Sequence, residues 1–519
     1  MPAPKVLFLG LDAADPALVR AWAHQGRLPH LAALLRDGFA CPTEGPPGFF
    51  VGAHWPSFYT ALNPARHGAH CWEQIEPGEY EPRRFLAGER VAGEPFWETL
   101  SRAGRRVAVV DVPLSGPAAS LNGLQLVEWG SHDPDLGLCS CPPALAGEVA
   151  ARFGLHPVQG NCNDPTRTAE DFARFRDDLV AGAKRKTDLN LHLLEREPWD
   201  LFVSVYSESH CVGHQCWHIH DRSHPRWDAA TAERVGDPLL DVYRALDAGV
   251  GRTLAAVRPD VAMIFLSHGM GPHYDPTFLL DDVLKQLEVA ERLAVPGRAL
   301  AALEALAARL PGPPGRRLRR AAARRRAALE ARAERLRRSL DRPAARRYFH
   351  HLNNHVESGI RINLAGREPQ GLVEPGRDYA RTCARLTRRL LALRDAETGE
   401  PMVRDVLRTR DLYAGERLDH LPDLAVRWRR SRQVEALHSP HAGTVRGTYR
   451  GPRSGDHTPE GLLLVTGPAV PAGRLDRTVS VMDLAPTLAA LLGVELDGVD
   501  GRPIAEVVAF AKAPHPQPA

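Results

Sequence analysis

Four short stretches of the chain are continuously apolar and end abruptly in polar residues. They are KVLFLGL (5–11), RRVAVVDVP (105–113), WDLFVSVYS (199–207) and DVAMIFLSHG (260–269). Apolar runs of this length without alternation are typical of strands buried on both faces of a parallel sheet. Ligand sites in such sheets lie beyond the carboxyl ends of the strands. Asp12, His210 and His268 fall at or just after these ends.

Between the strands, the apolar residues recur with the spacing of amphipathic helices, as in residues 15–38 and 168–196. Strands that alternate with helices predict an α/β fold, a three-layer α/β/α sandwich with a mostly parallel central sheet. We assign residues 1–290 and 348–510 to this domain. We expect residues 511–519 to be a disordered tail.

One segment departs from this pattern. Residues 298–347 are rich in Ala, Leu and Arg, and the sequence PGPPG at 311–315 interrupts them. Because Pro and Gly favour a turn there, we predict an inserted, Arg-rich helical hairpin over residues 291–347. Its basic second half fits two alternatives. It is either a solvated helix whose arginine stems cover the domain below, or a lid that attracts an anionic substrate.

The overall composition narrows the function classes only slightly. Apolar residues make up 44% of the 519 residues and the net charge is +3, so composition gives no reason to expect nucleic acid as a partner. No stretch approaches the ~18 uninterrupted apolar residues of a membrane span. The first apolar run is short and soon meets Asp12 and Asp15, unlike a signal peptide. We therefore expect a cytoplasmic protein with reduced cysteines, and the oligomeric state stays open.

The stretch SESHCVGHQCWH (207–218) contains a candidate metal site. His210 and His214 are four residues apart, so on a helix they share one face and can hold one ion. A third ligand has to come from elsewhere in the chain. Candidates are Asp12, His268 and His457, the last of which lies in the polar segment SGDHTPEG.

Several segments resemble, in order, motifs of the alkaline phosphatase superfamily, and most closely those of bacterial type I phosphodiesterase / nucleotide pyrophosphatase-like proteins. The segments are LGLDAADP (9–16), HWPSFYTALNPARHGAH (54–70), SESHCVGHQCW (207–217), LSHGMGP (266–272), IRINLAGREPQG (360–371), SGDHTPEG (454–461) and MDLAPTLAALLGVELDGVDGRPI (482–504). The resemblance implies an α/β/α sandwich with two divalent metals, commonly zinc. These activate a Thr or Ser nucleophile and neutralise a phosphoryl transition state.

The chain departs from the family pattern at three positions of the expected site. His210 stands where the family motif has Asp, and Ser267 replaces the Asp of the S-D-H-G motif. The position of the nucleophile falls on Val51, whose side chain cannot attack phosphorus. Three alternatives follow: direct attack by zinc-bound hydroxide, a substitute hydroxyl nucleophile, or loss of the family chemistry.

The same departures affect the two metal positions that the resemblance implies in different ways. One metal would keep His210, His214 and His457, a three-histidine zinc site with an open fourth position. The other would keep only Asp12 and His268, because Ser267 is a poor ligand. We therefore expect one firmly held Zn²⁺ and a second that is weak or absent.

Ser57 and His54, both near Val51, are the candidate catalytic residues. Ser57, and after it Thr60, could supply a substitute hydroxyl, although either could instead brace the helix that follows the loop. His54 could act as a general acid or extra ligand, or be a packed histidine.

The leading prediction is a metal-dependent hydrolase that acts on a phosphodiester or a related small anionic phosphate ester. Two alternatives stay open. The scaffold could be repurposed for another single-zinc reaction in specialised metabolism, or the protein could be a non-catalytic metal-containing binding protein.

Overall fold

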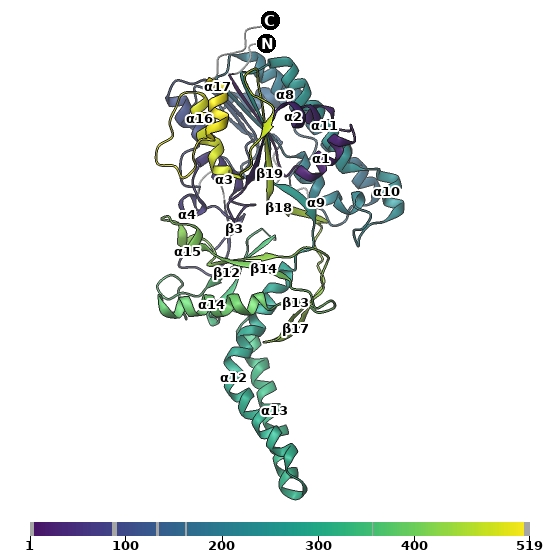
Figure 1. The fold of residues 1–519 in the computed structure, drawn as a ribbon, viewed down its shortest axis with the longest axis vertical. Helices are drawn as coiled ribbons and strands as arrows, with labels where there is room; N and C mark the ends of the chain where they lie inside the picture. Colours follow the sequence, from purple (N-terminus) through teal and green to yellow (C-terminus); the bar gives the residue numbers. More distant parts are fainter. Residues whose placement is uncertain (1–4, 86–90, 131–133, 161–162, 355, 513–519) are drawn as a thin grey trace.

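The computed structural model describes residues 5–85, 91–130, 134–160, 163–354 and 356–512. These residues form two parts, an α/β domain and a smaller unit from which a long helical hairpin extends (Figure 1). Ala511 and Lys512 close the last helix, and residues 513–519 of the expected tail lie outside the described residues.

The described part of the α/β domain is built on a ten-stranded sheet with the order β20-β2-β19-β9-β1-β8-β5-β6-β7, to which β21 adds beside β2. The five strands from β9 to β6 are parallel, whereas β19 and β7 run antiparallel to their neighbours. The strands are β1 (Val6–Leu11), β2 (Phe39–Glu44), β5 (Val107–Val110), β6 (Gly123–Val127), β7 (Cys139–Cys141), β8 (Leu201–Tyr206), β9 (Val261–Leu266), β19 (Glu460–Thr466), β20 (Gly473–Arg474) and β21 (Val479–Ser480). The predicted α/β fold with a mostly parallel central sheet is confirmed.

Helices cover both faces of this sheet. Because successive side chains of a strand point to opposite faces, each buried strand contributes to two hydrophobic cores. Leu7, Leu9 and Leu11 of β1 belong to one core, whereas Val6 and Phe8 belong to the other. Around the first core lie α1 (Pro16–His24), α2 (Pro29–Asp37), α7 (Ala144–Phe153), α8 (Ala169–Arg196), α9 (Glu208–His220), α10 (Ala229–Val235) and α11 (Pro238–Val257). Around the second lie α3 (His54–Thr60), α6 (Phe96–Arg102), α16 (Leu484–Leu491) and α17 (Ala505–Lys512).

The smaller unit has a separate hydrophobic core between an antiparallel sheet, β11-β12-β15-β14, and the helix α14. Its elements are β11 (Tyr348–His351), β12 (Glu357–Ile362), α14 (Arg377–Leu391), β13 (Arg394–Asp395), β14 (Val403–Arg408), β15 (Leu424–Trp428), β16 (Ala436–Ser439) and β17 (Gly443–Arg446). The part of the chain that departs from the α/β sandwich is therefore larger than the hairpin alone, since it also includes strands within residues 348–446, which we assigned to the α/β domain.

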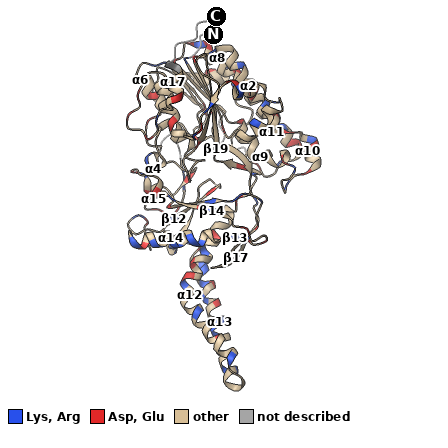
Figure 2. Cartoon of the chain, viewed as in Figure 1, with Lys and Arg blue, Asp and Glu red and all other residues tan. Residues whose placement is uncertain are grey.

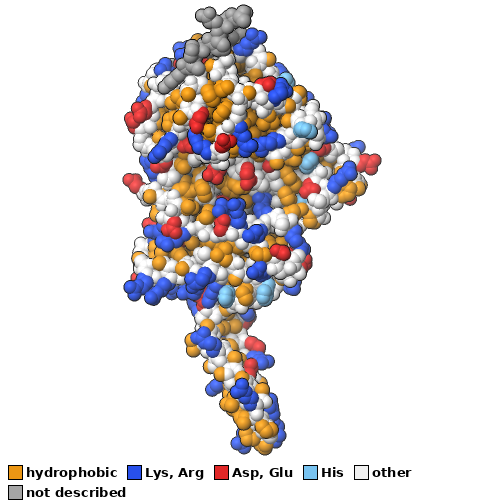
Figure 3. Space-filling view, viewed as in Figure 1, with side chains coloured by type: hydrophobic (Ala, Val, Ile, Leu, Met, Phe, Trp, Pro, Cys, Tyr) orange, Lys and Arg blue, Asp and Glu red, His pale blue; other side chains and the backbone are white. Residues whose placement is uncertain are grey.

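The hairpin consists of α12 (Leu280–Arg309) and α13 (Gly312–Ser339). It is rooted in the smaller unit and extends away from the central sheet, so it does not lie over the carboxyl ends of β1, β8 and β9 (Figure 1). Basic and acidic residues both lie along α12, whereas α13 is mainly basic (Figure 2). Its far end shows basic and hydrophobic side chains together (Figure 3). The arrangement fits the solvated helix pair, one of the two alternatives for this segment.

The smaller unit instead contacts the loop that carries Val51. Tyr413 Oη donates to the carbonyl of Pro47 at 2.8 Å, and Asn353 Nδ2 donates to the carbonyl of Gly48 at 2.7 Å. Arg430 donates to the carbonyl oxygens of Pro272 and His457. These contacts hold the smaller unit beside the carboxyl end of the central sheet.

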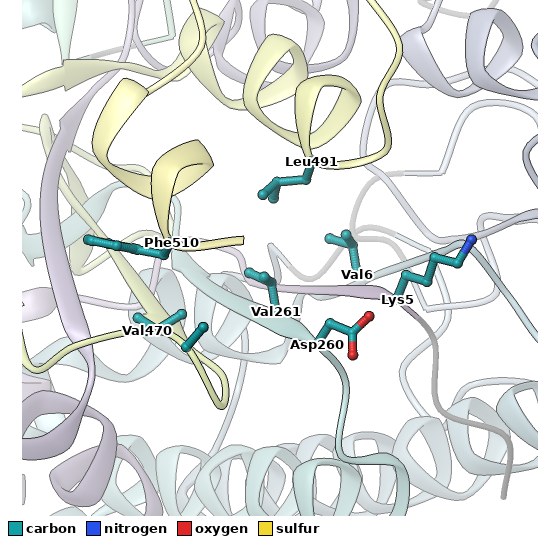
Figure 4. Close-up of a pocket in the computed structure, with 8 residues that line it drawn as sticks. Lys5, Val6, Asp260, Val261, Val470, Leu491 and Phe510 are labelled. Atoms are coloured by element: carbon teal, nitrogen blue, oxygen red, sulfur yellow. The ribbon is translucent and has the colours of Figure 1, made fainter. Parts of the chain in front are cut away.

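The opposite end of the sheet contains a small pocket of about 110 Å³ that includes Lys5, Val6, Asp260 and Val261 at the start of β1 and β9 (Figure 4). It holds none of the predicted site residues. Within the described residues, every helix is too short or too polar to cross a membrane.

Candidate metal centre

Three histidines from two distant segments converge at the carboxyl end of the sheet. Helix α9 begins at Glu208, directly after β8, and so places His210 and His214 on one face. His457 comes from β18 (Gly455–Thr458), which pairs with β10 (Gly269–Pro272). All three side chains are buried, and each offers a ring nitrogen within 4.8 Å of the other two. The predicted three-histidine set is therefore brought together.

Hydrogen bonds assign the nitrogen that His214 presents to this centre. Its Nδ1 lies 2.8 Å from the carbonyl oxygen of Gly455, which can only accept, so Nδ1 carries the proton. The lone pair on Nε2 then faces His457 Nε2, 3.1 Å away. Tetrahedral zinc bonds of about 2.0–2.1 Å place neighbouring ligand atoms roughly 3.3 Å apart. The spacing of the two nitrogens therefore fits a shared zinc ion.

A chain of hydrogen bonds leads from Asp12 to His457 and fixes the proton on each ring. Ser267 Oγ accepts from the backbone N–H of Ala13 and donates to Asp12 Oδ1, both at 3.0 Å. Because the hydroxyl proton is used, His268 Nδ1 must donate to Ser267 Oγ, also at 3.0 Å. His268 Nε2 then accepts from His457 Nδ1 at 2.9 Å. His457 Nε2 is left with its lone pair turned to the three-histidine centre.

This chain gives Asp12 and His268 contacts that the sequence did not reveal. Both are predicted metal ligands, and in this structure they are linked to His457 through Ser267, in the way that groups behind metal ligands commonly are. Trp55 Nε1 also donates to Asp12 Oδ1 at 2.9 Å, which occupies the carboxylate further. Among the described residues, Asp12 and His268 belong to no group of three convergent metal-ligating side chains.

Ser57 is held by a histidine and is fully buried in α3. His67 Nδ1 accepts from the backbone N–H of Ala69 at 3.0 Å, and burial lowers the pKa of His67 to about 3. The neutral ring therefore carries its proton on Nε2, which donates to Ser57 Oγ at 2.9 Å. A ring in this tautomer cannot take the proton from the serine hydroxyl. Thr60 Oγ1 donates to the carbonyl of Pro56 at 2.6 Å and so braces the end of the same helix.

His54 lies between the central sheet and the histidine cluster. Its ring stacks on Phe265 with 5.7 Å between centroids and lies 5.0 Å from the ring of His268. Burial lowers the pKa of His54 to about 3, so the ring is neutral at physiological pH. The half-buried Val51 follows Phe50, whose ring is 6.1 Å from that of His268. His54 is thus close to His268, and Val51 directly follows a residue whose ring lies beside that of His268.

Three further buried residues were not singled out from the sequence. His273, Asp275 and Asp456 also converge within 4.8 Å of one another, next to the three-histidine centre. The available signals were the H-x-D spacing after LSHGMGP and the position of Asp456 directly before His457. Neither signal is specific, because short polar segments with such residues are common in loops.

A sequence comparison with protein families identifies the family of the chain. A sequence model of the family described as type I phosphodiesterase / nucleotide pyrophosphatase matches residues 6–435. The chain belongs to this family. Its members are hydrolytic enzymes that act on phosphoesters, so the predictions of this family and of a hydrolytic enzyme are confirmed. A comparison with curated proteins finds no relative.

Solved structures of similar proteins share little sequence with the chain. Phosphonoacetate hydrolase from Sinorhizobium meliloti 1021 in complex with phosphonoformate is 13% identical with a TM-score of 0.48, covering 99% of this chain and 96% of that chain. Murine ectonucleotide pyrophosphatase / phosphodiesterase 5 is 12% identical with a TM-score of 0.48, covering 96% of this chain and 97% of that chain.

Proposed function

We propose that the protein hydrolyses a small phosphate ester at a single three-histidine metal centre, with water as the nucleophile and no covalent enzyme intermediate. The observation that carries the proposal is that the residues at the family's metal positions form two separate sets. His210, His214 and His457 converge on one centre, while Asp12 and His268 are joined through Ser267 and orient His457.

The donor set supports Zn²⁺ as the metal, since three neutral imidazoles with an open fourth position form a good zinc site. A divalent zinc bound there would acidify a water molecule and polarise a phosphoryl oxygen. The chain's own residues set the geometry. Gly455 and His268 hold the rings of His214 and His457 so that both Nε2 atoms face the centre.

The residues available near Val51 support water rather than a side chain as the nucleophile. Valine has no group that can attack phosphorus. Ser57 accepts a hydrogen bond from His67 and is buried in α3, while the Thr60 hydroxyl donates to the carbonyl of Pro56 in the same helix. We propose that Ser57 braces α3 against His67 and that His54, neutral and packed on Phe265, limits the space beside His268.

Hydrolysis of bis(p-nitrophenyl) phosphate and p-nitrophenyl phosphate by purified protein tests the activity. We expect turnover that is lost in His214→Ala together with the bound zinc. The matched control is His192→Ala, a partly exposed histidine on α8 whose ring lies 3.6 Å from Glu148. Wild-type protein that is no more active than His214→Ala on either ester would refute the proposal.

The stereochemistry at phosphorus tests the absence of a covalent intermediate. A chiral phosphorothioate diester should be hydrolysed with inversion, because a single in-line displacement by water inverts phosphorus. Two displacements, first by a side chain and then by water, would give net retention. Retention in wild type, lost in Ser57→Ala, would make Ser57 the nucleophile.

A further inference from the structure

A second group of metal-ligating atoms lies beside the three-histidine centre and is not part of the family's pair of sites. His273 follows β10, Asp275 lies in the link toward α12, and Asp456 lies in β18. The side chains are 4%, 1% and 0% exposed, respectively. His273 Nε2 faces both carboxylates at once, at 3.6 Å from Asp275 Oδ2 and 3.4 Å from Asp456 Oδ2.

These distances are longer than the about 2.7–3.2 Å of a typical hydrogen bond between nitrogen and oxygen. Within the described residues, neither His273 Nε2 nor Asp456 Oδ2 has a hydrogen-bonding partner, although both atoms are buried. Buried polar atoms without partners are costly and call for an explanation. Metal bonds of about 2.0–2.2 Å in tetrahedral geometry place ligand atoms roughly 3.3–3.6 Å apart, which matches the observed separations.

The surroundings hold these three side chains in place. The ring of Tyr449 stacks on His273 with 4.1 Å between centroids and an interplanar angle of 22°. Asp456 Oδ1 accepts from the backbone N–H of His457 at 2.9 Å, which turns Oδ2 toward His273. Asp275 Oδ1 accepts from the backbone N–H of Thr277 at 3.3 Å, so its other oxygen is the one that faces His273.

His273, Asp275 and Asp456 form a group separate from the three-histidine centre. His214 lies between the two, with Nε2 facing His457 and Nδ1 donating to Gly455, 3.9 Å from Asp456 Oδ1. Asp456 and His457 are successive residues of a strand, so their side chains point to opposite faces. Each group therefore has its own set of converging atoms.

We propose that His273, Asp275 and Asp456 bind a second divalent transition-metal ion, such as Zn²⁺ or Mn²⁺, at a separate site. One imidazole nitrogen and two carboxylate oxygens suit these ions better than Ca²⁺ or Mg²⁺, which prefer oxygen ligands alone. The two carboxylates neutralise the ion's charge, which the three-histidine centre does not. The ion joins β10, β18 and the link to α12, and so fixes the crossing from the central sheet to the smaller unit.

Anomalous X-ray scattering at the zinc edge, from crystals grown with zinc, tests the proposal without reference to activity. We expect one peak among His210, His214 and His457 and another among His273, Asp275 and Asp456. A peak at the first position with none at the second would overturn the proposal and leave a metal-free ion pair.

Matched variants separate the two sites in solution. Asp275→Asn keeps the shape of the side chain but removes its charge, so we expect at least a tenfold weaker second zinc and an unchanged first. Asp282→Asn, on the exposed side of α12, is the control and should bind as wild type does. Loss of both zincs in Asp275→Asn, or of neither, would contradict a separate site.

A variant that lacks the three-histidine centre keeps the test of the second site independent of the proposed function. In His210→Ala we expect one zinc per chain and a rise in Tm when zinc is added, since an ion that binds only the folded state stabilises it. The added Asp275→Asn change should abolish both effects. A His210→Ala protein that binds no zinc would overturn the second site, whatever the fate of the hydrolase activity.

Discussion

Removal of the Ser267 hydroxyl would break the chain of hydrogen bonds that orients His457. The hydroxyl takes part in three contacts of 3.0 Å, to Ala13 N, Asp12 Oδ1 and His268 Nδ1. In Ser267→Ala, His268 loses the anchor that fixes its proton, and the proton on His457 is then free to move to the nitrogen that should bind the metal. Loss of a group behind a metal ligand typically costs 10–100-fold in affinity, or about 1.4–2.7 kcal/mol.

Competition with a chromophoric chelator measures this loss as the Kd for zinc at the three-histidine centre, in an Asp275→Asn background that weakens the second proposed site. The matched control is Ser204→Ala. Ser204 is also fully buried in the central sheet, and its Oγ donates to Asn190 Oδ1 at 3.0 Å. Both variants should lose roughly 1–3 kcal/mol of folding stability, because each leaves a buried polar partner unsatisfied.

Only Ser267→Ala should also weaken zinc binding. Equal zinc affinity in the two variants and in wild type would refute the orienting role of Ser267. A tenfold loss in both variants would show that the effect follows from destabilisation of the sheet rather than from the orientation of His457.

Three further predictions follow from the contacts described above. Ser57→Ala should keep kcat within about twofold yet lose roughly 1 kcal/mol of stability, because the Nε2–H of His67 loses its acceptor; a loss of kcat above tenfold would restore Ser57 as a catalytic residue. Burial raises the pKa of Glu357 to about 7, with Arg427 acting in the opposite direction. Because the folded pKa then exceeds the unfolded one, the free energy of unfolding should fall by roughly 3 kcal/mol as pH rises from about 4.5 to about 7. Glu357→Gln should flatten this decline in urea unfolding measured across that range, and an unchanged pH profile would exclude Glu357 as its source. Replacement of residues 298–328 by a Gly-Ser turn should leave KM and its salt dependence unchanged, since this part of the hairpin extends away from the site (Figure 1); a higher KM at low salt would revive the lid.

The amino-acid sequence by itself determined the elements that depend on local periodicity. Buried runs such as residues 5–11 and 260–269 formed strands because an unbroken apolar segment needs cover on both faces. The i, i+4 spacing placed His210 and His214 on one face of α9, because that spacing is a property of the helix itself. The order of the motifs predicted the family and assigned His457 to the same metal site.

Tertiary structure decided what each polar residue does at the ends of those strands. Ser267 contacts residues more than 250 positions away, and no local pattern could show that its hydroxyl links Asp12 to His268. His273, Asp275 and Asp456 converge only because β10 pairs with β18.

The hairpin was likewise recognisable as two helices, but its direction depends on where the smaller unit holds its root. Helix periodicity carries no information on that placement. Roles that rest on contacts between distant segments therefore required the folded chain.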